Sequence, residues 1–575
     1  MSALRDRVRR LRLVAEPTPS WQVPPAPGVA RPDLGVAIAA SDRLSAGLAD
    51  QWRQRPVTPD AVAFGSADLL LVELVDGVVP GFGPPAEPEV VALLAAADRS
   101  SVPVVLWITS GRPPSGADRT AAVAGLIEAA SVVFVADLLE AWQELVPHAR
   151  LLAPAATARR LARDHRAGDG AEPRAVLVSA GPPDALAAGL VATAVAPALR
   201  PLVDQLDVLL LDHDLPARGV LPRPLTELAH TTRHTGVVDA IAAAAVVVDG
   251  PRRTPGDTWT VLEAAAAGTP VVSLAGLHLP EGLVAATPGG ATEVRAEVVA
   301  RLHQPELADR EALVQRRAVL ERHTFAHRAG ELLAAVGRPE PTAAESTVSA
   351  VVPTNRPHEI DNVLASIGRQ AHRSVELVLV LHGIELPAAE LRARARDHGV
   401  PDLQVVEAPS HLTLGACLNR GAQVAGGDLI AKMDDDNYYG THYLTDLVQA
   451  LEAQGAGIAG KWAHYVWLRS TGAVVLRYPD FESAWARRIQ GGTMLFTADV
   501  LRDLEFADLP RAVDSDILDR AITAGVPIWS ADRFNFVSVR GDDRTTHTWT
   551  VEDATFFTAS GRLAFYGDPR THVEV

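Results

Sequence analysis

Residues 418–436 form the stretch LNRGAQVAGGDLIAKMDDD, which ends in three consecutive aspartates, Asp434, Asp435 and Asp436. They close the apolar run DLIAKM, which predicts a buried β-strand. Adjacent carboxylates repel one another, so at a strand end they gain little unless a cation or a hydrogen-bonding ligand lies between them. Because side chains alternate along a strand, Asp434 and Asp436 point to one side, where two carboxylates can bind Mg²⁺ or Mn²⁺. An acidic turn without a metal is the alternative.

The segments around this strand have the pattern of an α/β protein. After residue 347 the apolar runs VSAVVPT, VELVLVL, LQVVEA and DLIAKM alternate with helix-like segments. Residues 33–338 show the same alternation, with runs such as ADLLLVEL, VPVVLWI and TPVVSLAG. Continuous apolar runs separated by helices are typical of strands buried on both faces of a parallel sheet. The sequence therefore predicts the α/β class throughout.

Changes in composition set the predicted domain boundaries. The stretch GRPEPTAAEST, residues 337–347, interrupts the alternation with Pro, Gly and small polar residues, which indicates an interdomain linker. A second break near residues 165–173 divides the first part into two Rossmann-like halves. We predict five segments: an N-terminal arm at 1–32, the two halves at 33–170 and 171–338, the linker at 339–347, and a C-terminal domain at 348–575.

Composition excludes several classes of protein. The 575 residues are 48% hydrophobic and 21% charged, a globular balance that argues against extensive disorder. The net charge of −17 argues against nucleic-acid binding, because phosphate backbones would be repelled. The single cysteine, Cys417, excludes an intramolecular disulfide and a thiolate-built zinc site, and it fits a reducing compartment. The many Ala, Arg, Pro and Gly residues are typical of a GC-rich bacterial gene.

The sequence predicts a cytoplasmic protein. It has no apolar run of the roughly 18 residues that a spanning helix needs, and its N-terminus lacks a signal-peptide core. The N-terminal arm carries Arg5, Arg7, Arg9, Arg10 and Arg12 among leucines. The arm is therefore either a solvated helix or a segment in peripheral contact with an anionic membrane surface.

Four segments resemble, in order, the family 2 inverting glycosyltransferases of the GT-A fold. They are a strand and helix at 351–370, the N-x-G-x-x-x-A-x-G-D pattern that starts at Asn419, the acidic strand end, and RAVDSDILDRAITAG at 511–525. The likeness spans about residues 347–550, and Val513 stands where the family commonly has Glu. The resemblance implies transfer of a sugar from a nucleotide diphosphate sugar, with inversion at the anomeric carbon.

The resemblance also implies a donor site with Mn²⁺ or Mg²⁺ as cofactor. Asp434 and Asp436 would bind the metal, and His547 would supply a third ligand unless it is an ordinary loop histidine. Contacts with the nucleotide sugar are expected from Thr354, Arg356, Asp434, Asp435, Gly491, Gly492, Arg540 and Arg544. The two glycines would permit close approach to a ligand, although a glycine bend before a strand explains them equally well.

Asp514 is the predicted general base, since an inverting transfer needs a group that takes the proton of the acceptor hydroxyl. Asp516 is expected to orient it. The alternative for this acidic pair is a helix N-cap, because an Asp before ILDRAITAG would satisfy free helix amides.

Two features leave the ligands open. After VELVLVL the family commonly has an Asp-Asp-Gly-like turn that contacts the base, and here the sequence is LHG, with His382 and Gly383. A UDP-sugar remains the favoured donor, but uracil recognition is less secure than metal binding. Trp462, Tyr465 and Trp467 would either stack on a sugar or pack within an ordinary sheet.

The first part of the chain resembles a CgeB-like unit of the GT-B glycosyltransferases. The stretches that carry this likeness are DTWTVLEAAAAGTPVVS at 257–273 and LERHTFAHRAGELL at 320–333. Glu263 would hold ribose hydroxyls in that fold, although Ala-rich helix packing alone explains the first stretch. A clear basic pair for a diphosphate is missing, with Arg252 and Arg253 nearby. We therefore expect an acceptor-binding, scaffold or homo-oligomerisation role.

These observations predict a metal-dependent inverting glycosyltransferase that acts on a hydroxyl of a bacterial glycan or cell-envelope acceptor. A sugar nucleotidyltransferase would show a Gly-rich loop with a basic residue after the first strand, and VVPTNRPHEI lacks one. A non-catalytic carbohydrate-binding or scaffold protein and a bifunctional transferase that uses both parts are the alternatives. The sugar, the acceptor and the oligomeric state stay open.

Overall fold

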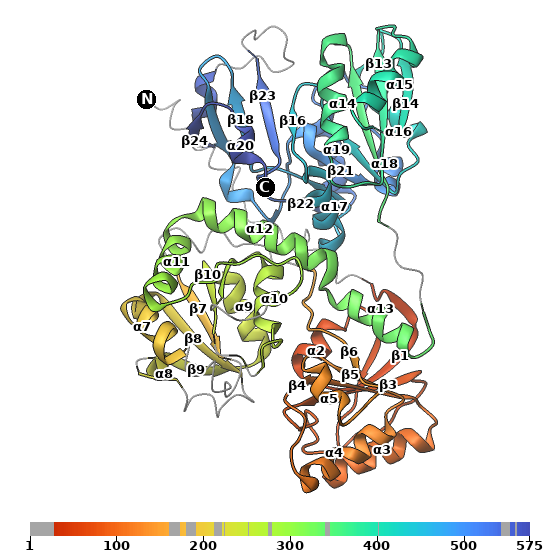
Figure 1. The fold of residues 1–575 in the computed structure, drawn as a ribbon. Helices are drawn as coiled ribbons and strands as arrows, with labels where there is room; N and C mark the ends of the chain where they lie inside the picture. Colours follow the sequence, from red (N-terminus) through yellow and green to blue (C-terminus); the bar gives the residue numbers. More distant parts are fainter. Residues whose placement is uncertain are drawn as a thin grey trace. The chain divides into compact units, whose positions relative to one another are not determined.

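The computed structural model of the chain describes residues 28–159, 173–179, 191–211, 221–223, 225–250, 252, 254–273, 279–339, 345–400, 402–541, 553–557 and 560–575. Contacts group this part of the chain into two compact units, one up to residue 339 and one from residue 345 (Figure 1). Most of the predicted arm, most of the predicted break near residues 165–173 and the middle of the predicted linker lie outside the described residues. None of the described helices has the length and apolar character needed to cross a membrane.

The first unit contains two parallel sheets. Six strands build the first of them, in the order β2-β1-β3-β4-β5-β6. They are β1 (Arg31–Ala39), β2 (Trp52–Pro56), β3 (Leu69–Val75), β4 (Val104–Ser110), β5 (Val132–Val135) and β6 (Arg150–Leu151). The helices of this half are α2 (Asp42–Gly47), α3 (Pro88–Arg99), α4 (Ala117–Ala129) and α5 (Leu139–Gln143).

The second sheet has the order β11-β10-β7-β8-β9. Its strands are β7 (Ala175–Ser179), β8 (Leu206–Leu211), β9 (Ala229–Thr232), β10 (Val246–Asp249) and β11 (Val271–Ser273). The described helical segments are η2 (Val191–Val195), α7 (Ala196–Leu199), η3 (Arg200–Gln205), α8 (Leu225–Leu228), α9 (His234–Ala243), α10 (Trp259–Ala267), α11 (Ala291–His303), α12 (Pro305–Arg322) and α13 (Phe325–Ala335). All pairings in both sheets are parallel, so the predicted α/β class is confirmed here.

Helix α13 joins the two halves into one unit. Its residues Phe325, Ala329 and Leu332 are buried with Val36 and Leu44 of the first half. The backbone of Ala156 also pairs with this region, since its N–H donates to the carbonyl of His323 over 2.9 Å. The chain therefore returns to its first sheet after completing the second one.

The second unit is built on an eight-stranded sheet with the order β14-β13-β12-β15-β21-β17-β22-β20. Its strands are β12 (Val348–Thr354), β13 (Val375–His382), β14 (Leu403–Ala408), β15 (Leu429–Lys432), β17 (Ile458–Gly460), β20 (Ala484–Trp485), β21 (Met494–Thr497) and β22 (Ile528–Ser530). Strands β14, β13, β12 and β15 are parallel, and β21 runs antiparallel to β15. The predicted parallel pattern therefore holds up to the acidic strand end.

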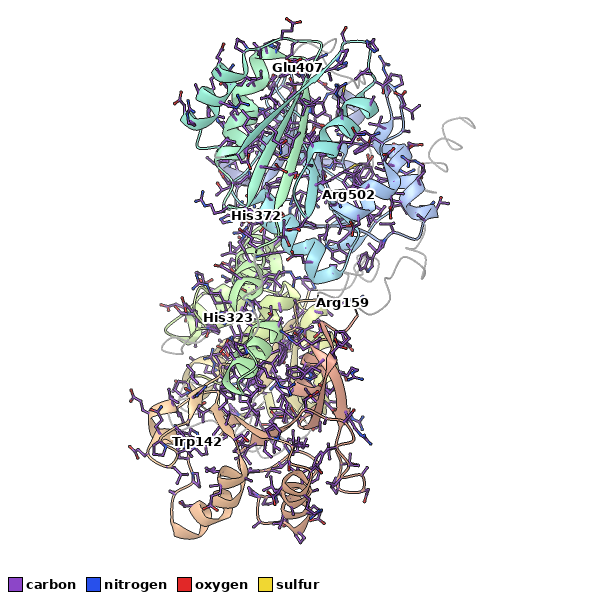
Figure 2. The ribbon with its side chains drawn as sticks, turned by 90° about the vertical axis from the view of Figure 1, so that its right-hand side faces the viewer. Trp142, Arg159, His323, His372, Glu407 and Arg502 are labelled. Atoms are coloured by element: carbon purple, nitrogen blue, oxygen red, sulfur yellow. The ribbon has the colours of Figure 1, made fainter. Side chains whose placement is uncertain are left out.

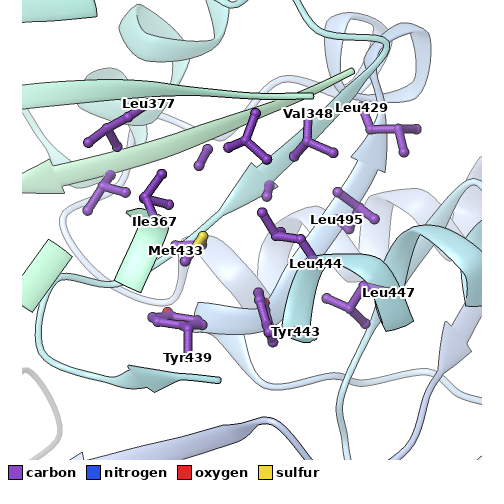
Figure 3. Packing of buried hydrophobic residues seen from close by; sticks show 14 of the residues in the cluster. Val348, Ile367, Leu377, Leu429, Met433, Tyr439, Tyr443, Leu444, Leu447 and Leu495 are labelled. Carbon is purple, nitrogen blue, oxygen red and sulfur yellow. The ribbon is translucent and has the colours of Figure 1, made fainter. Parts of the chain in front are cut away.

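Helices cover both faces of this sheet. They are η5 (Pro357–Glu359), α14 (Ile360–Gly368), α15 (Ala388–Asp397), α16 (Leu414–Val424), α17 (Tyr443–Gln454), α18 (Ala498–Leu504) and α19 (Val513–Thr523). One face packs Val348 and Leu377 of the strands against Leu444 and Leu447 of α17 (Figure 3). The other face packs Val351 of β12 against Leu418 of α16. Because both faces are buried, the strands have continuous apolar runs rather than alternating ones.

The glycine in the N-x-G pattern is explained by this packing. A Cβ atom on Gly421 would lie 2.5 Å from Cγ1 of Val351 and 2.9 Å from Cγ2 of Val380. Helix α16 thus lies close to the sheet at a point where only glycine fits.

A smaller sheet with the order β16-β23-β18-β19-β24 completes the second unit. Its strands are β16 (Tyr438–Tyr439), β18 (His464–Leu468), β19 (Ala473–Arg477), β23 (Phe536–Arg540) and β24 (Gly561–Tyr566), with η6 (Pro479–Phe481), η9 (Asp553–Phe557) and α20 (Arg570–Val573) nearby in the chain.

The beginning of the unit is held by His372, labelled in Figure 2, whose ring contacts Ser346 O at 2.9 Å and Glu345 at 2.8 Å.

Candidate active site

The three aspartates leave the sheet where β15 lies between β12 and β21. The backbone N–H of Asp434 donates to the hydroxyl of Tyr439 over 2.7 Å, and that hydroxyl donates to the carbonyl of Gly492 over 2.8 Å. Tyr439 is 1% exposed and packs against Tyr443 and Phe536. A buried tyrosine therefore links the acidic loop, residues 434–437, to the turn that precedes β21.

Asp435 makes its contacts inside the protein. Its Oδ2 accepts hydrogen bonds from Thr354 Oγ1 at 2.6 Å and from Arg356 Nε at 3.1 Å, and its Oδ1 pairs with the same guanidinium. Burial lowers the pKa of Arg356, but the bonds to Asp435 and the charge of Asp436 outweigh it and raise that pKa. Asp435 is 5% exposed, which leaves little room for the predicted nucleotide contact. Its carboxylate thus links the three aspartates to Thr354 at the end of β12 and to Arg356.

Asp434 and Asp436 keep open sides, with side-chain exposures of 35% and 21%. Asp436 Oδ2 lies 3.0 Å from Arg356, and Asp434 Oδ2 accepts from Asn437 at 3.2 Å. Burial raises the pKa of Asp434; Lys432 opposes this, while the negative charges of Asp436 and Asp514 add to it. Burial, together with the neighbouring negative charges, therefore raises the pKa of Asp434 overall, and a bound cation would relieve the repulsion between the carboxylates.

These two carboxylates fit a magnesium or manganese ion. In proteins Mg²⁺ is typically bound by one or two carboxylates together with phosphate oxygens and water. Within the described ranges no group of three or more His, Cys, Asp or Glu side chains is arranged to hold a metal. His547, predicted as a third ligand, and Arg544 lie outside the described residues.

Asp514 lies beside the acidic loop although it comes from a different segment. Helix α19 begins at Val513 after Ala512, which has φ 60°, so Asp514 stands in the first helical turn and is not the N-cap. The N-cap explanation of the acidic pair is therefore wrong. Asp514 Oδ1 lies 3.3 Å from Nζ of Lys432, and its side chain is 35% exposed.

Gly491 and Gly492, at the start of η7 (Gly491–Thr493), contact the carboxylates themselves. A Cβ atom on Gly491 would lie 2.6 Å from Cγ of Asp514, and one on Gly492 would lie 2.9 Å from Cγ of Asp434. The sequence predicts close approach of a ligand to these glycines, and in this structure the groups close to them are two carboxylates of the protein. A side chain at either position would have to displace one of these carboxylates.

Lys432 joins these parts and is not among the site residues expected from the sequence. Its Nζ lies 2.9 Å from Asp434 Oδ1, 2.8 Å from Gly491 O and 3.3 Å from Asp514 Oδ1. Burial lowers the pKa of Lys432, but the two aspartates outweigh it and raise that pKa, so the residue is a cation. A sequence signal existed: the chain has 53 Lys and Arg residues, and only Lys432 and Lys461 are lysines.

Two other predicted residues, Asp516 and Arg540, make contacts with other parts of the protein. Asp516 Oδ2 accepts from Arg520 Nε over 2.8 Å, and Arg520 also donates to the carbonyl of Glu505, so the Asp516 carboxylate is paired with a side chain of its own helix. Arg540 ends β23 and places its guanidinium 5.0 Å from the ring centre of Phe556. Its neighbour Val539 donates to Asn437 Oδ1 over 3.1 Å, so this strand end adjoins the acidic loop.

The aromatic residues of β18 and its flank make different contacts within the protein. Trp462 stacks on Tyr478, with ring centres 3.9 Å apart and planes 9° from parallel. Tyr465 is 2% exposed, and its hydroxyl accepts from Arg533 over 3.1 Å. Arg469 lies over the ring of Trp467. Tyr465 therefore packs within the sheet.

Glu263, the predicted ribose ligand of the first unit, is already paired with two basic side chains of the protein. Its Oε1 lies 2.8 Å from Arg43 Nε and 2.7 Å from His234 Nε2. Burial raises the pKa of Glu263, but Arg43 and His234 outweigh it and lower that pKa. Arg252 is likewise buried against Asp249, and Arg253 lies outside the described residues.

Comparison with known proteins identifies the class of the second unit. Residues 349–496 match the model of the glycosyl transferase family 2. The matched segment contains Thr354, Arg356, the acidic run and both glycines, while Asp514 lies beyond it. The chain therefore contains a glycosyltransferase domain of this family.

Among solved structures, the chain is similar to the mannosyltransferase PcManGT from Pyrobaculum calidifontis in complex with GDP-Man and Mn²⁺, with 20% identity, TM-score 0.29, and coverage of 34% of this chain and 57% of that one. It is also similar to S. aureus TarS 1–349 in complex with UDP-GlcNAc, with 16% identity, TM-score 0.28, and coverage of 34% and 59%. The matched part thus spans less than two thirds of either structure. No curated protein sequence matches the chain.

Proposed function

We propose that the second unit is the catalytic domain of a metal-dependent inverting glycosyltransferase. The observation that carries the proposal is the meeting of Asp434 and Asp514 on either side of Lys432, each carboxylate lying against one of the two glycines. Two partly exposed carboxylates with a fixed counter-charge suit a reaction that needs a charged donor and a base in one place.

The donor is a nucleotide diphosphate sugar, with a UDP-sugar favoured by the family resemblance. Asp434 and Asp436 would hold Mn²⁺ or Mg²⁺, which neutralises negative charge on the departing diphosphate. Arg356 supplies further positive charge at the same loop, since it contacts Asp436 at 3.0 Å and is 25% exposed. At the end of β12 the Thr354 hydroxyl donates to Asp435 and accepts from the backbone N–H of Arg356, so it holds these two residues next to each other.

Asp514 acts as the general base. The oxygen of the acceptor hydroxyl bonds to the anomeric carbon while the bond from that carbon to the diphosphate oxygen breaks, and the hydroxyl proton passes to the Asp514 carboxylate. Attack opposite the leaving group inverts the anomeric centre. The Asp514 side chain is partly exposed and therefore accessible to an acceptor. Its place beside the acidic loop would bring the acceptor hydroxyl next to the nucleotide sugar.

The acceptor is a hydroxyl of a bacterial glycan or cell-envelope precursor, reached from the cytoplasm. We propose a non-catalytic role for residues 33–338, as a CgeB-like unit that binds acceptor, serves as a scaffold or supports a homo-oligomer. The support is Glu263, whose carboxylate is already paired with Arg43 and His234. Peripheral membrane contact of the N-terminal arm belongs to the same proposal.

The test is nucleotide release by the purified chain with Mn²⁺ or with EDTA, across UDP-, GDP- and dTDP-sugars that include UDP-GlcNAc and GDP-mannose. Metal-dependent release from one donor, lost in Asp436→Ala, would support the proposal. Absence of release from every donor, together with absence of thermal stabilisation by any nucleotide with metal, would favour a carbohydrate-binding protein instead.

A further inference from the structure

Lysine is used at only two positions of this chain, and both are buried in the second unit. Lys432 is 4% exposed and Lys461 is 0% exposed. Lys461 Nζ contacts Asp532 Oδ1 at 2.9 Å and Asp532 O at 3.0 Å. Each lysine therefore places its ammonium between a carboxylate and a backbone carbonyl, while arginine supplies the other basic side chains apart from histidine.

The choice of lysine at position 432 has a physical reason. An ammonium is a compact charge with three donors that can point in different directions, whereas a guanidinium is a planar fork. The three oxygens around Lys432 belong to three separate segments, since Asp434 follows β15, Gly491 begins η7 and Asp514 belongs to α19. A compact charge can contact all three at once.

From these contacts we infer that Lys432 is a positioning residue. It holds the base Asp514 against Gly491 and beside the acidic loop that would bind the donor. The inference rests on the proposed function, because it concerns the same site. Lys432 is too buried to touch a substrate, so it acts through Asp514 and is not itself catalytic. Without its charge, the carboxylates of Asp434 and Asp514 would repel each other across the position that it occupies.

The consequence for the reaction is geometric. Gly491 limits Asp514 on one side and Lys432 holds it on the other, so the base has one orientation relative to the acceptor hydroxyl. Misplacement of a reacting group by about 1 Å costs on the order of 100-fold in rate. Loss of the Lys432 charge should therefore lower kcat by about 100-fold and leave the KM for the donor within about threefold.

The kinetic test compares Lys432→Met with Lys461→Met, which removes an equally buried ammonium outside the site. We expect the loss in kcat for Lys432→Met alone, although both variants lower Tm. In an Asp514→Asn background, Lys432→Met should cause no further loss, because the residue acts through Asp514. Wild-type kcat in Lys432→Met, or losses that add fully in the double variant, would overturn the inference.

A second measurement retains Lys432 and needs no turnover. Protein labelled with ¹³C-lysine has two lysine side-chain signals, which Lys461→Met assigns. Asp514→Asn should shift the Lys432 Cε signal and leave that of Lys461 in place; an unmoved Lys432 signal would overturn the inference. Absence of turnover in the wild-type chain would count against the proposed function, whereas normal turnover in Lys432→Met would count against the Lys432 inference alone.

Discussion

Gly491 lies so close to Asp514 that a Cβ atom on the glycine would come within 2.6 Å of the aspartate Cγ. The glycine precedes β21 and the aspartate belongs to α19, so two segments far apart in the sequence define one wall of the site. This contact limits the positions that the Asp514 carboxylate can occupy, and several predictions depend on it.

Substituting Gly491→Ala should displace Asp514 and lower the transfer rate by about 100-fold, as expected for a reacting group moved by about 1 Å. Overpacking should also cost about 1–3 kcal/mol of unfolding free energy. Steady-state kinetics and urea unfolding measure the two effects. Gly426→Ala is the matched control, because a Cβ atom there meets Glu376 Oε1 at an ordinary 3.5 Å. Full activity in Gly491→Ala would show that Asp514 tolerates displacement.

Substituting Asp436→Ala should abolish metal-dependent binding of the donor nucleotide. The residue offers a carboxylate that is 21% exposed beside Asp434, and a single remaining carboxylate is a weak site for Mn²⁺. Calorimetric titration with nucleotide, with and without Mn²⁺, measures the change. Asp499→Ala, which removes a carboxylate that is 94% exposed on α18, serves as the control. Unchanged binding in Asp436→Ala would remove this residue from the metal site.

Substituting Asp514→Asn should leave nucleotide binding within about threefold and lower transfer by about 100- to 10,000-fold, the usual contribution of a general base. The amide keeps the shape of the side chain but cannot accept the acceptor proton at neutral pH. Asp516→Asn is the internal comparison, because Asp516 pairs with Arg520 and not with the site. Equal losses in both variants would contradict the assignment of the base.

Substituting Glu263→Gln should lower the stability of the first unit and leave transfer unchanged. The carboxylate is buried between Arg43 and His234, and breaking a buried ion pair costs about 3–5 kcal/mol. A loss of transfer without a loss of stability would instead indicate that the first unit takes part in the reaction.

The same pair predicts a pH dependence. The folded-state pKa of Glu263 lies below its usual value of 4.5, so its stabilising contribution is present above pH 4.5 and is lost as the pH falls through the folded-state pKa. The difference in unfolding free energy between the wild type and Glu263→Gln should therefore shrink as the pH falls below about 4.5. Thermal unfolding over this range measures it, and a difference that grows on acidification would contradict the ion pair.

Much of the fold follows from local sequence. The runs around β12, β13 and β15 predict buried parallel strands because apolar side chains face both ways along them, and the structure covers both faces with helices. The position of Asp434 and Asp436 at a strand end follows from the same pattern. Arg520 shows the limit of this reasoning, because its i,i+4 pairing with Asp516 follows from the predicted helix, whereas its bonds to the carbonyls of Leu504 and Glu505 follow only from the packing of α19 against the end of α18.

Lys432 marks the division between what sequence and structure determine. The sequence by itself determined the α/β class, the strand that precedes the aspartates, and the segments that resemble a glycosyltransferase, because each depends on residues close together in the chain. Only the tertiary structure decided that Lys432, Gly491 and Asp514 meet, and that Glu263 is paired with Arg43. Such contacts join segments that are distant in the sequence. A buried charge needs a partner because an unpaired buried charge costs free energy, and the folded geometry decides which side chain becomes that partner. A local sequence pattern contains no information on that geometry.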